Sequence, residues 1–319
     1  MAHQSVSQCR FYVNVMEWLS LNNAIAITTS SSKQWINTLP VNPILYDHST
    51  QGHEILFTPV TNIFNSESFV AVLGHDFNSR GQGYVIKNGI SDTEGETMTD
   101  YVNGCAVWDD VPPYDGFSIS TFNGIGIEDM VIRFTGNTEE SGNPSFASVI
   151  IGTYHTMPHS PDMSLTLGYE TGTKTIETRG GSSLSNTMWR PPMWGDTLGA
   201  WELHDPASDS LVGQTLAHSS RRTWDLNFSY LSKENTFPKY NALNRLVDAN
   251  ETVPDDETLL TSNDFFSRVY NIVGTALPFI FQPDKDANEF AIAKFSKPIS
   301  FQQTSPNLYS IKCRIVETW

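Results

Sequence analysis

Short stretches in which apolar and polar residues alternate one by one constrain the fold of this chain most strongly. Residues 223–230 and 309–315 alternate in this way, and residues 132–135 repeat the pattern over a shorter length. Alternation with a period of two places the apolar side chains on one face of a strand, which is typical of half-buried antiparallel sheets. Residues 69–73 and 147–151 are near-continuous apolar runs, which we expect to be central strands of a sandwich. Clusters of Gly, Pro and Asn separate these segments, and that spacing favours β-sandwiches or barrels.

The length of the chain predicts more than one domain. A domain usually has roughly 100–200 residues, and this chain has 319. We therefore predict a mainly β protein with two β-sandwich domains. The expected organisation is an N-terminal arm over residues 1–30, a first domain over 31–157, and a second domain over 158–319 with an extended segment near 180–200.

Two segments of the second half are predicted to be helical. Residues 265–273 follow Asp264, which can cap a helix start, and precede Gly274, which is suited to a helix end. Residues 238–249 contain an apolar stripe formed by Leu243, Leu246 and Val247. We expect a β-sandwich with one or two helices in this half.

Composition excludes several classes of function. The formal net charge is −16, whereas nonspecific nucleic-acid binding requires cationic side chains that neutralise phosphates. No window approaches the ~20 apolar residues of a membrane span, and the first ten residues do not resemble a signal peptide. We therefore expect neither nucleic-acid binding nor membrane insertion. Charged residues make up only 17% of the chain, so Ser, Thr and Asn dominate its polar surface. Such a surface suits permanent packing against neighbours, and it is also compatible with an ordinary β-rich surface.

The three cysteines predict neither a disulfide framework nor a zinc site. Cys9, Cys105 and Cys313 are far apart, odd in number, and form no CxxC motif. Cys313 alternates with Ile311 and Ile315, so we expect it to behave as a small core residue.

Motifs for catalysis are weak or missing in the sequence. No GxSxG nucleophile elbow is present, and Gly124-Ile125-Gly126 lacks the third glycine of a dinucleotide site. Paired carboxylates occur at residues 109–110 and 255–257, where loop acids are usually solvated. We predict a protein that is not an enzyme and has no cofactor. The alternative is a glycan-degrading enzyme, because glycosidases use two carboxylates at a set separation.

Three histidines and one aspartate are candidate site residues. His75 precedes Asp76, which could orient it as a base, but a strand-end histidine more commonly bonds loop atoms. His155 and His159 have the spacing of a helical zinc motif, yet that motif's Glu is missing and Pro158 would break the helix. We expect structural roles for all of them and no metal.

An acidic turn and a tryptophan cluster complete the set of candidates. Residues 284–288 imitate the start of a calcium loop, but Glu289 and Phe295 occupy positions that an EF-hand reserves for Gly and Glu. We predict a polar hairpin turn there, with another kind of calcium site as the alternative. Trp189, Trp194 and Trp201 lie close together in sequence and could stack on sugar rings, although packing against a neighbouring domain or subunit is the favoured interpretation.

Several short segments of the chain resemble segments of virion proteins of tailed bacteriophages. Residues 69–77, Phe-Val-Ala-Val-Leu-Gly-His-Asp-Phe, resemble an apolar strand followed by Leu-Gly-His-Asn-Leu. That signature recurs in phage modules similar to the discoidin or galactose-binding jelly roll, and here Asp76 and Phe77 replace its Asn and Leu. The second half is similar to the same proteins at residues 221–231, 265–269, 277–284 and 315–319.

The resemblance implies a tail-tip or baseplate subunit, with the distal tail protein as the nearest role. It implies an N-terminal jelly roll and a C-terminal β-sandwich with helix, like that of tail-tube and distal tail proteins, although distal tail proteins have the two domains in the opposite order. The expected partners are copies of the chain in a ring, other tail and baseplate proteins, and a host surface glycan. The expected location is the virion tail, after synthesis in the host cytoplasm. No catalytic residue carries over.

The alternative to a purely structural role is a carbohydrate- or receptor-binding module of the tail. A glycan would then bind in loops near residues 75–83 or 109–115. The residues predicted to contact a glycan or a neighbouring subunit are His75, Asp76, Trp189 and Trp194.

Overall fold

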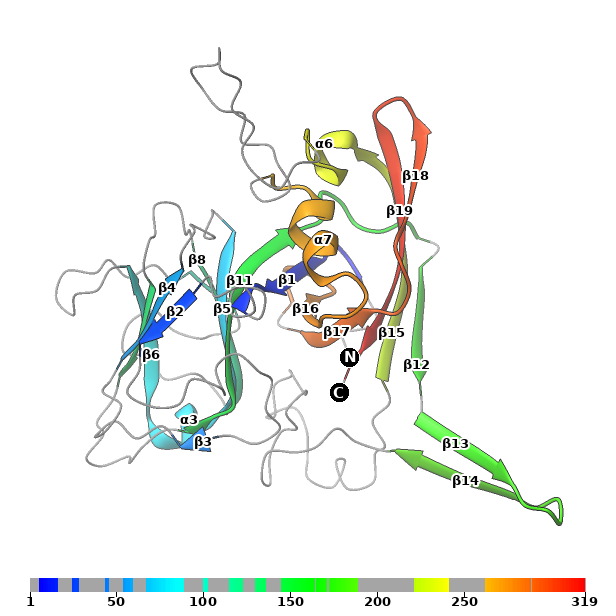
Figure 1. Cartoon of the computed structure of the whole chain (residues 1–319), viewed down its shortest axis with the longest axis horizontal. Coiled ribbons are helices and arrows are strands. Elements are labelled where there is room, and N and C mark those ends of the chain that lie inside the picture. Colours follow the sequence, from blue (N-terminus) through cyan, green and yellow to red (C-terminus); the bar gives the residue numbers. More distant parts are fainter. Residues whose placement is uncertain are drawn as a thin grey trace.

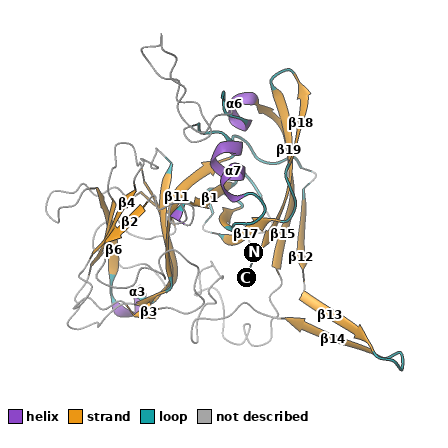
Figure 2. Cartoon of the chain, in the orientation of Figure 1, coloured by secondary structure: helices purple, strands orange, loops and turns teal. Residues whose placement is uncertain are grey.

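The fold is defined by a computed structural model that describes part of the chain. The described residues are 6–16, 25–28, 44–45, 54–59, 67–88, 100–102, 115–122, 130–135, 145–163, 165–170, 172–188, 221–240, 262–287 and 289–318. Strands dominate them, with a few short helices (Figure 2). The prediction of a mainly β fold is therefore confirmed.

A large antiparallel sheet forms the body of the molecule (Figure 1). Its strands in spatial order are β12 (Thr166–Glu170), β15 (Arg221–Ser232), β19 (Leu308–Glu317), β17 (Ala291–Phe295), β16 (Phe279–Gln282), β1 (Arg10–Asn14), β11 (Ser148–Thr156), β5 (Ser68–His75), β8 (Gly116–Phe122) and β7 (Asp100–Val102), and β18 (Ser300–Ser305) also pairs with β19. The alternating and apolar segments predicted from the sequence are strands of this sheet, apart from residues 132–135.

A second sheet packs against the part of the large sheet that comes from the first half of the chain. Its strands in spatial order are β2 (Ile25–Thr28), β4 (Glu54–Pro59), β9 (Met130–Thr135) and β6 (Gly83–Asn88), and Figure 1 shows it as a separate layer. The Tyr84 hydroxyl on β6 and the Ser120 hydroxyl on β8 are 3.1 Å apart and hydrogen-bonded. This buried contact links the two layers. Two further pairs complete the strands: β3 (Ile44–Leu45) with β10 (Ser145–Phe146), and β13 (Gly172–Glu177) with β14 (Ser183–Met188).

Strand β1 joins the two halves of the chain. It pairs with β11 on one side and with β16 on the other, so that Tyr12 lies between Tyr154 and Ile280. The Tyr12 hydroxyl also donates a 2.7 Å hydrogen bond to Gln282 Oε1. The sequence suggested an arm over residues 1–30, and the structure places residues 10–14 inside the sheet instead.

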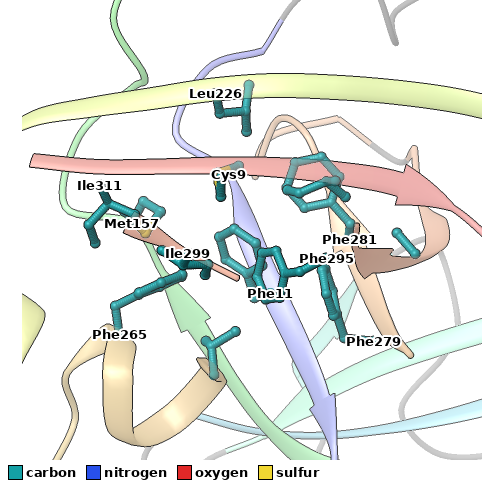
Figure 3. Close-up of a cluster of buried hydrophobic side chains, with 14 of the residues drawn as sticks. Cys9, Phe11, Met157, Leu226, Phe265, Phe279, Phe281, Phe295, Ile299 and Ile311 are labelled. Atoms are coloured by element: carbon teal, nitrogen blue, oxygen red, sulfur yellow. The ribbon is translucent and has the colours of Figure 1, made fainter. Parts of the chain in front are cut away.

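The larger of the two apolar clusters found among the described residues lies on one face of the sheet around β1. Phe11 is fully buried there, 5.3 Å from Phe281 and 5.4 Å from Phe265 between ring centroids. Figure 3 shows these rings together with Phe279 and Phe295. Tyr12, the next residue along the strand, belongs to a separate cluster with Phe69, Ile280 and other buried residues. Because successive side chains of β1 point to opposite faces, this strand contributes aromatic side chains to both clusters.

A helical segment covers this core. It starts at Phe265 and continues as the π-helix η4 (Phe266–Tyr270) and the α-helix α7 (Asn271–Val273). Asp264 Oδ1 accepts a 2.9 Å hydrogen bond from the Ser267 amide, and Gly274 follows with φ of 51°. The predicted helix over 265–273 is therefore confirmed, together with both of its end signals.

The other helix prediction has a different outcome. Residues 238–240 are not helical, and residues 241–249 lie outside the described residues. Two short helices that the sequence did not indicate are α3 (Phe77–Arg80) and α6 (Lys233–Thr236). The Ser232 hydroxyl accepts from the Asn235 amide at the start of α6, so a local cap accounts for that turn. None of the helices in the described ranges has the length and apolar character required to span a membrane.

Gly152 provides a test of the contact between β1 and its neighbour. A Cβ atom at this position would lie 1.8 Å from the Val13 carbonyl oxygen and 3.1 Å from a ring carbon of Phe69. Gly152→Ala must therefore push β1 away from β11, and we expect the free energy of unfolding to fall by about 3 kcal/mol or more. Chemical denaturation of the full chain measures the change.

Gly180→Ala is the matched control, because a Cβ there meets nothing within 4 Å. Its free energy of unfolding should stay within about 0.5 kcal/mol of the parent. Equal stabilities for the two variants would contradict the close packing of β1 on β11.

Candidate functional site

His75 and Asp76 form a structural corner at the end of β5. Asp76 Oδ1 accepts a 2.8 Å hydrogen bond from the Ser145 amide, and Asp76 Oδ2 lies 2.5 Å from Arg80 Nε. The His75 ring is buried and stacks on Phe77 with 4.4 Å between ring centroids. These contacts hold the end of β5 to α3 and β10.

The protonation state of His75 follows from its burial. Burial lowers the pKa of His75 to about 4, so the imidazole is neutral at pH 7. Nδ1 accepts from the Phe77 amide at 3.4 Å, which leaves the proton on Nε2, 2.5 Å from the Ser118 hydroxyl on β8. The predicted contact of His75 with a glycan would require a ring that reaches the surface, and this one is 3% exposed.

The other predicted site residues divide into two groups. Two of the residues predicted to contact a glycan or a subunit, Trp189 and Trp194, lie outside the described residues. Trp201 also lies outside them. The acidic turn after β16 is described except for Asn288, and it connects β16 and β17 as a hairpin. Asp284 Oδ1 accepts hydrogen bonds from the Ser7 hydroxyl at 2.6 Å and the Asp286 amide at 3.1 Å, as in a side-chain-stabilised turn.

His155 and His159, which have the spacing of a helical zinc motif, have different surroundings. His155, on β11, is buried under the helix and lies 6.0 Å from the Phe265 ring between centroids. His159 Nδ1 is 2.8 Å from the Ser160 carbonyl oxygen, and its ring lies near Phe228. Within the described ranges, no three His, Cys, Asp or Glu side chains are grouped as metal ligands would be.

His155 is the most unusual buried polar group of the described chain. Neither ring nitrogen has a hydrogen-bond partner among the described residues. Burial, with a smaller contribution from the charge of Arg268, lowers the pKa of His155 to about 4. The His155 ring therefore contributes packing area, but its two nitrogens are buried without hydrogen bonds. Burial of unsatisfied polar atoms lowers the stability of the folded state.

An ion-pair network that the sequence did not indicate fixes the edge of the large sheet. Arg222 on β15 forms a bidentate contact with Glu317 on β19, at 2.7 Å and 3.1 Å, and its side chain is 18% exposed. Arg314 on β19 bridges to Glu170 on the edge strand β12 at 2.7 Å. Ion pairs between strands that are far apart in sequence carry no signal in a single sequence, because the strand order that brings them together is not local.

The hairpin of β13 and β14 projects from this edge (Figure 1). Every residue from Lys174 to Ser185 is exposed except Thr178, which is half-buried. Ile176 is 56% exposed and Leu184 is 61% exposed, and the two are cross-strand partners. Neither strand has a clear sequence signal, because hydroxyl-bearing and charged residues dominate both, although the Gly180-Gly181 pair marks their turn. This hairpin is the candidate assembly surface.

Comparison of the chain with protein-family models, with curated proteins and with solved structures finds no match.

The two buried histidines should respond in opposite ways to the same substitution. His155→Phe removes two unsatisfied polar atoms from an aromatic site, so we expect the free energy of unfolding to rise by about 1 kcal/mol. His75→Phe leaves the buried Ser118 hydroxyl without its imidazole partner, so we expect a loss of about 1–3 kcal/mol. Chemical denaturation at pH 7 measures both, and a gain for His75→Phe would contradict the hydrogen-bonding role given to this residue.

Stability should also fall as the pH falls through the range set by these histidines. Their pKa values are about 4 in the folded chain and 6.5 in the unfolded chain, so the unfolded state binds more protons between these values. Each histidine therefore removes up to ~1.4 kcal/mol of stability per pH unit as the pH falls from about 6.5 to 4. Denaturation of the parent and of His155→Phe across this range should show a shallower slope for the variant, whereas parallel curves would contradict the low pKa.

Proposed function

We propose that this chain is a virion structural protein of a phage tail tip or baseplate, and that it assembles as a ring or adaptor joining the tail tube to host-recognition parts. The observation that carries the proposal is the combination of a tightly packed, mainly β body with a projecting hairpin whose apolar side chains are exposed. Such side chains gain stability when a neighbouring surface covers them.

The segments that resemble phage virion proteins form strands and a helix that pack together. Residues 221–231 belong to β15, residues 277–284 include β16, and residues 315–319 include the end of β19. These strands lie in one part of the large sheet, and the helix that begins at Phe265 covers the same core. The grouping supports the resemblance, because a shared fold would conserve neighbouring strands rather than scattered turns.

The use of polar groups also favours an assembled structural part. His75, Asp76 and Arg222 bond to other parts of the same chain and stabilise strand ends and edges. The contacts described for these three side chains stabilise the fold. A structural subunit requires such a rigid body, with its recognition surfaces placed on the outside.

The location of the chain in a particle tests this proposal directly. Antibodies raised against the purified protein should label one end of the tail in electron micrographs of phage particles from the strain that carries the gene. Mass spectrometry of the same purified particles should detect the chain. Particles that lack the chain by both measurements would overturn the proposal.

A further inference from the structure

His155 lies between the large sheet and the helical segment of residues 265–273, which we call the helical cover. Its cross-strand partner on β1 is Phe11. The Phe265 ring of the helical cover is close to both side chains, at 5.4 Å from Phe11 and 6.0 Å from His155 between ring centroids. On its other side β11 pairs with β5 only as far as Thr153, so β5 does not flank His155. Among the described residues, the helical cover therefore encloses the His155 ring on the side away from the sheet.

The surroundings of His155 suit a neutral ring and not a charged one. The residue is 5% exposed, and among the described residues neither ring nitrogen has a hydrogen-bond partner. A protonated imidazole carries two N–H donors and a positive charge, and burying it without acceptors costs far more than burying the neutral ring. Burial, with a smaller contribution from Arg268, accordingly lowers the pKa of His155 to about 4. Protonation of the ring is therefore favourable only when the helical cover opens to water.

The charges on the neighbouring elements make this response to acid stronger. Arg268, on the helical cover, repels a proton on His155. Glu67, which precedes β5, and Asp264, at the start of the helical cover, partly offset the Arg268 charge. Glu67 Oε2 also accepts a 3.0 Å hydrogen bond from Asn263 Nδ2, which ties the helical cover to β5. Because carboxylates lose their charge in acid, acidification leaves Arg268 and a protonated His155 as like charges across one contact.

The neighbours of His155 in and before β1 contribute no charge to this contact. Phe11 is apolar, and the Cys9 thiol stays neutral because burial raises its pKa well above the usual value. Arg10 lies on the opposite face of β1, where its guanidinium carbon is 5.2 Å from the centroid of the Tyr154 ring. The response to acid therefore arises between β11 and the helical cover.

We infer that His155 is an acid sensor for the helical cover: the cover closes only over the neutral ring, and protonation of the ring favours an open cover on an intact sheet. The open state lets water reach the ring nitrogens and uncovers the aromatic side chains around Phe11. This conformational device goes beyond the proposed function and does not depend on it.

The size of the effect follows from the two protonation equilibria. The pKa of His155 is about 4 under the closed cover and 6.5 in water, so the open state binds more protons between these values. The closed cover is thus most stable above pH 6.5 and loses stability as the pH falls toward 4. The equilibrium constant for opening should rise about twentyfold from pH 7 to pH 5.

Hydrogen exchange with mass spectrometry at pH 7 and pH 5 measures this opening in the full chain. Peptides within residues 265–273 should show the rise of about twentyfold once the pH dependence of intrinsic exchange is removed. At both pH values their opening constants should exceed those of peptides from β1 and β11, because the sheet stays paired when the cover opens. Equal constants for the cover and the sheet would show that the cover opens only with global unfolding, and would overturn the inference.

Two matched substitutions assign the effect to one histidine. His155→Phe keeps an aromatic ring under the cover but cannot be protonated, so the change in cover opening between pH 7 and pH 5 should shrink to less than about threefold. His75→Phe makes the same replacement at the other buried histidine, which stacks on Phe77 and not on the cover, so the rise of about twentyfold should remain. A rise that persists in His155→Phe, or that is lost in His75→Phe, would overturn the inference, as would a parent whose cover opens equally at both pH values.

Discussion

The pairing of β1 with β11 and β16 is the interaction on which the rest of the structure depends. β11 comes from the first half of the chain and β16 from the second, so one five-residue strand makes the large sheet continuous. Phe11 enters the core under the helix, while Tyr12 enters the cluster on the other face and bonds Gln282. Without this strand, both cores would lose central aromatic side chains and two neighbouring strands would expose unpaired edges.

Buried and half-buried polar groups reinforce this arrangement near strand ends and at the start of the helix. The Asp264 carboxylate caps the helix, the His75 imidazole joins β5 to β8, and the Arg222–Glu317 pair joins β15 to β19. Each of these groups is satisfied within the chain, apart from the second carboxylate oxygen of Asp264. Exposed apolar side chains occur on the projecting hairpin, where Ile176 and Leu184 are cross-strand partners, and also at Met163, Tyr169 and Tyr230.

Local patterns in the sequence were sufficient for many of the elements. Residues 223–230 and 309–315 show strict alternation, and the helix at 265–273 has Asp264 and Gly274 as its end signals, so each could be predicted from its own residues. The strand at residues 10–14 has only three consecutive apolar residues, and its partners lie about 140 and 270 positions away. No local pattern encodes such a pairing. The hairpin is hard to predict for a different reason: its strands have no core-facing side, so their alternation carries almost no hydrophobic signal. At the candidate site, the structural role of His75 was expected, but its hydroxyl partner on another strand could not be derived from sequence.

Hydrogen exchange of the full chain, followed by mass spectrometry, tests the central role of β1 most directly. If β1 joins the two halves into one cooperative unit, peptides containing residues 10–14, 150–155 and 279–282 should exchange slowly and with a common free energy, equal to that of global unfolding. Rapid exchange of residues 10–14, or clearly different free energies for the strands on its two sides, would contradict this account.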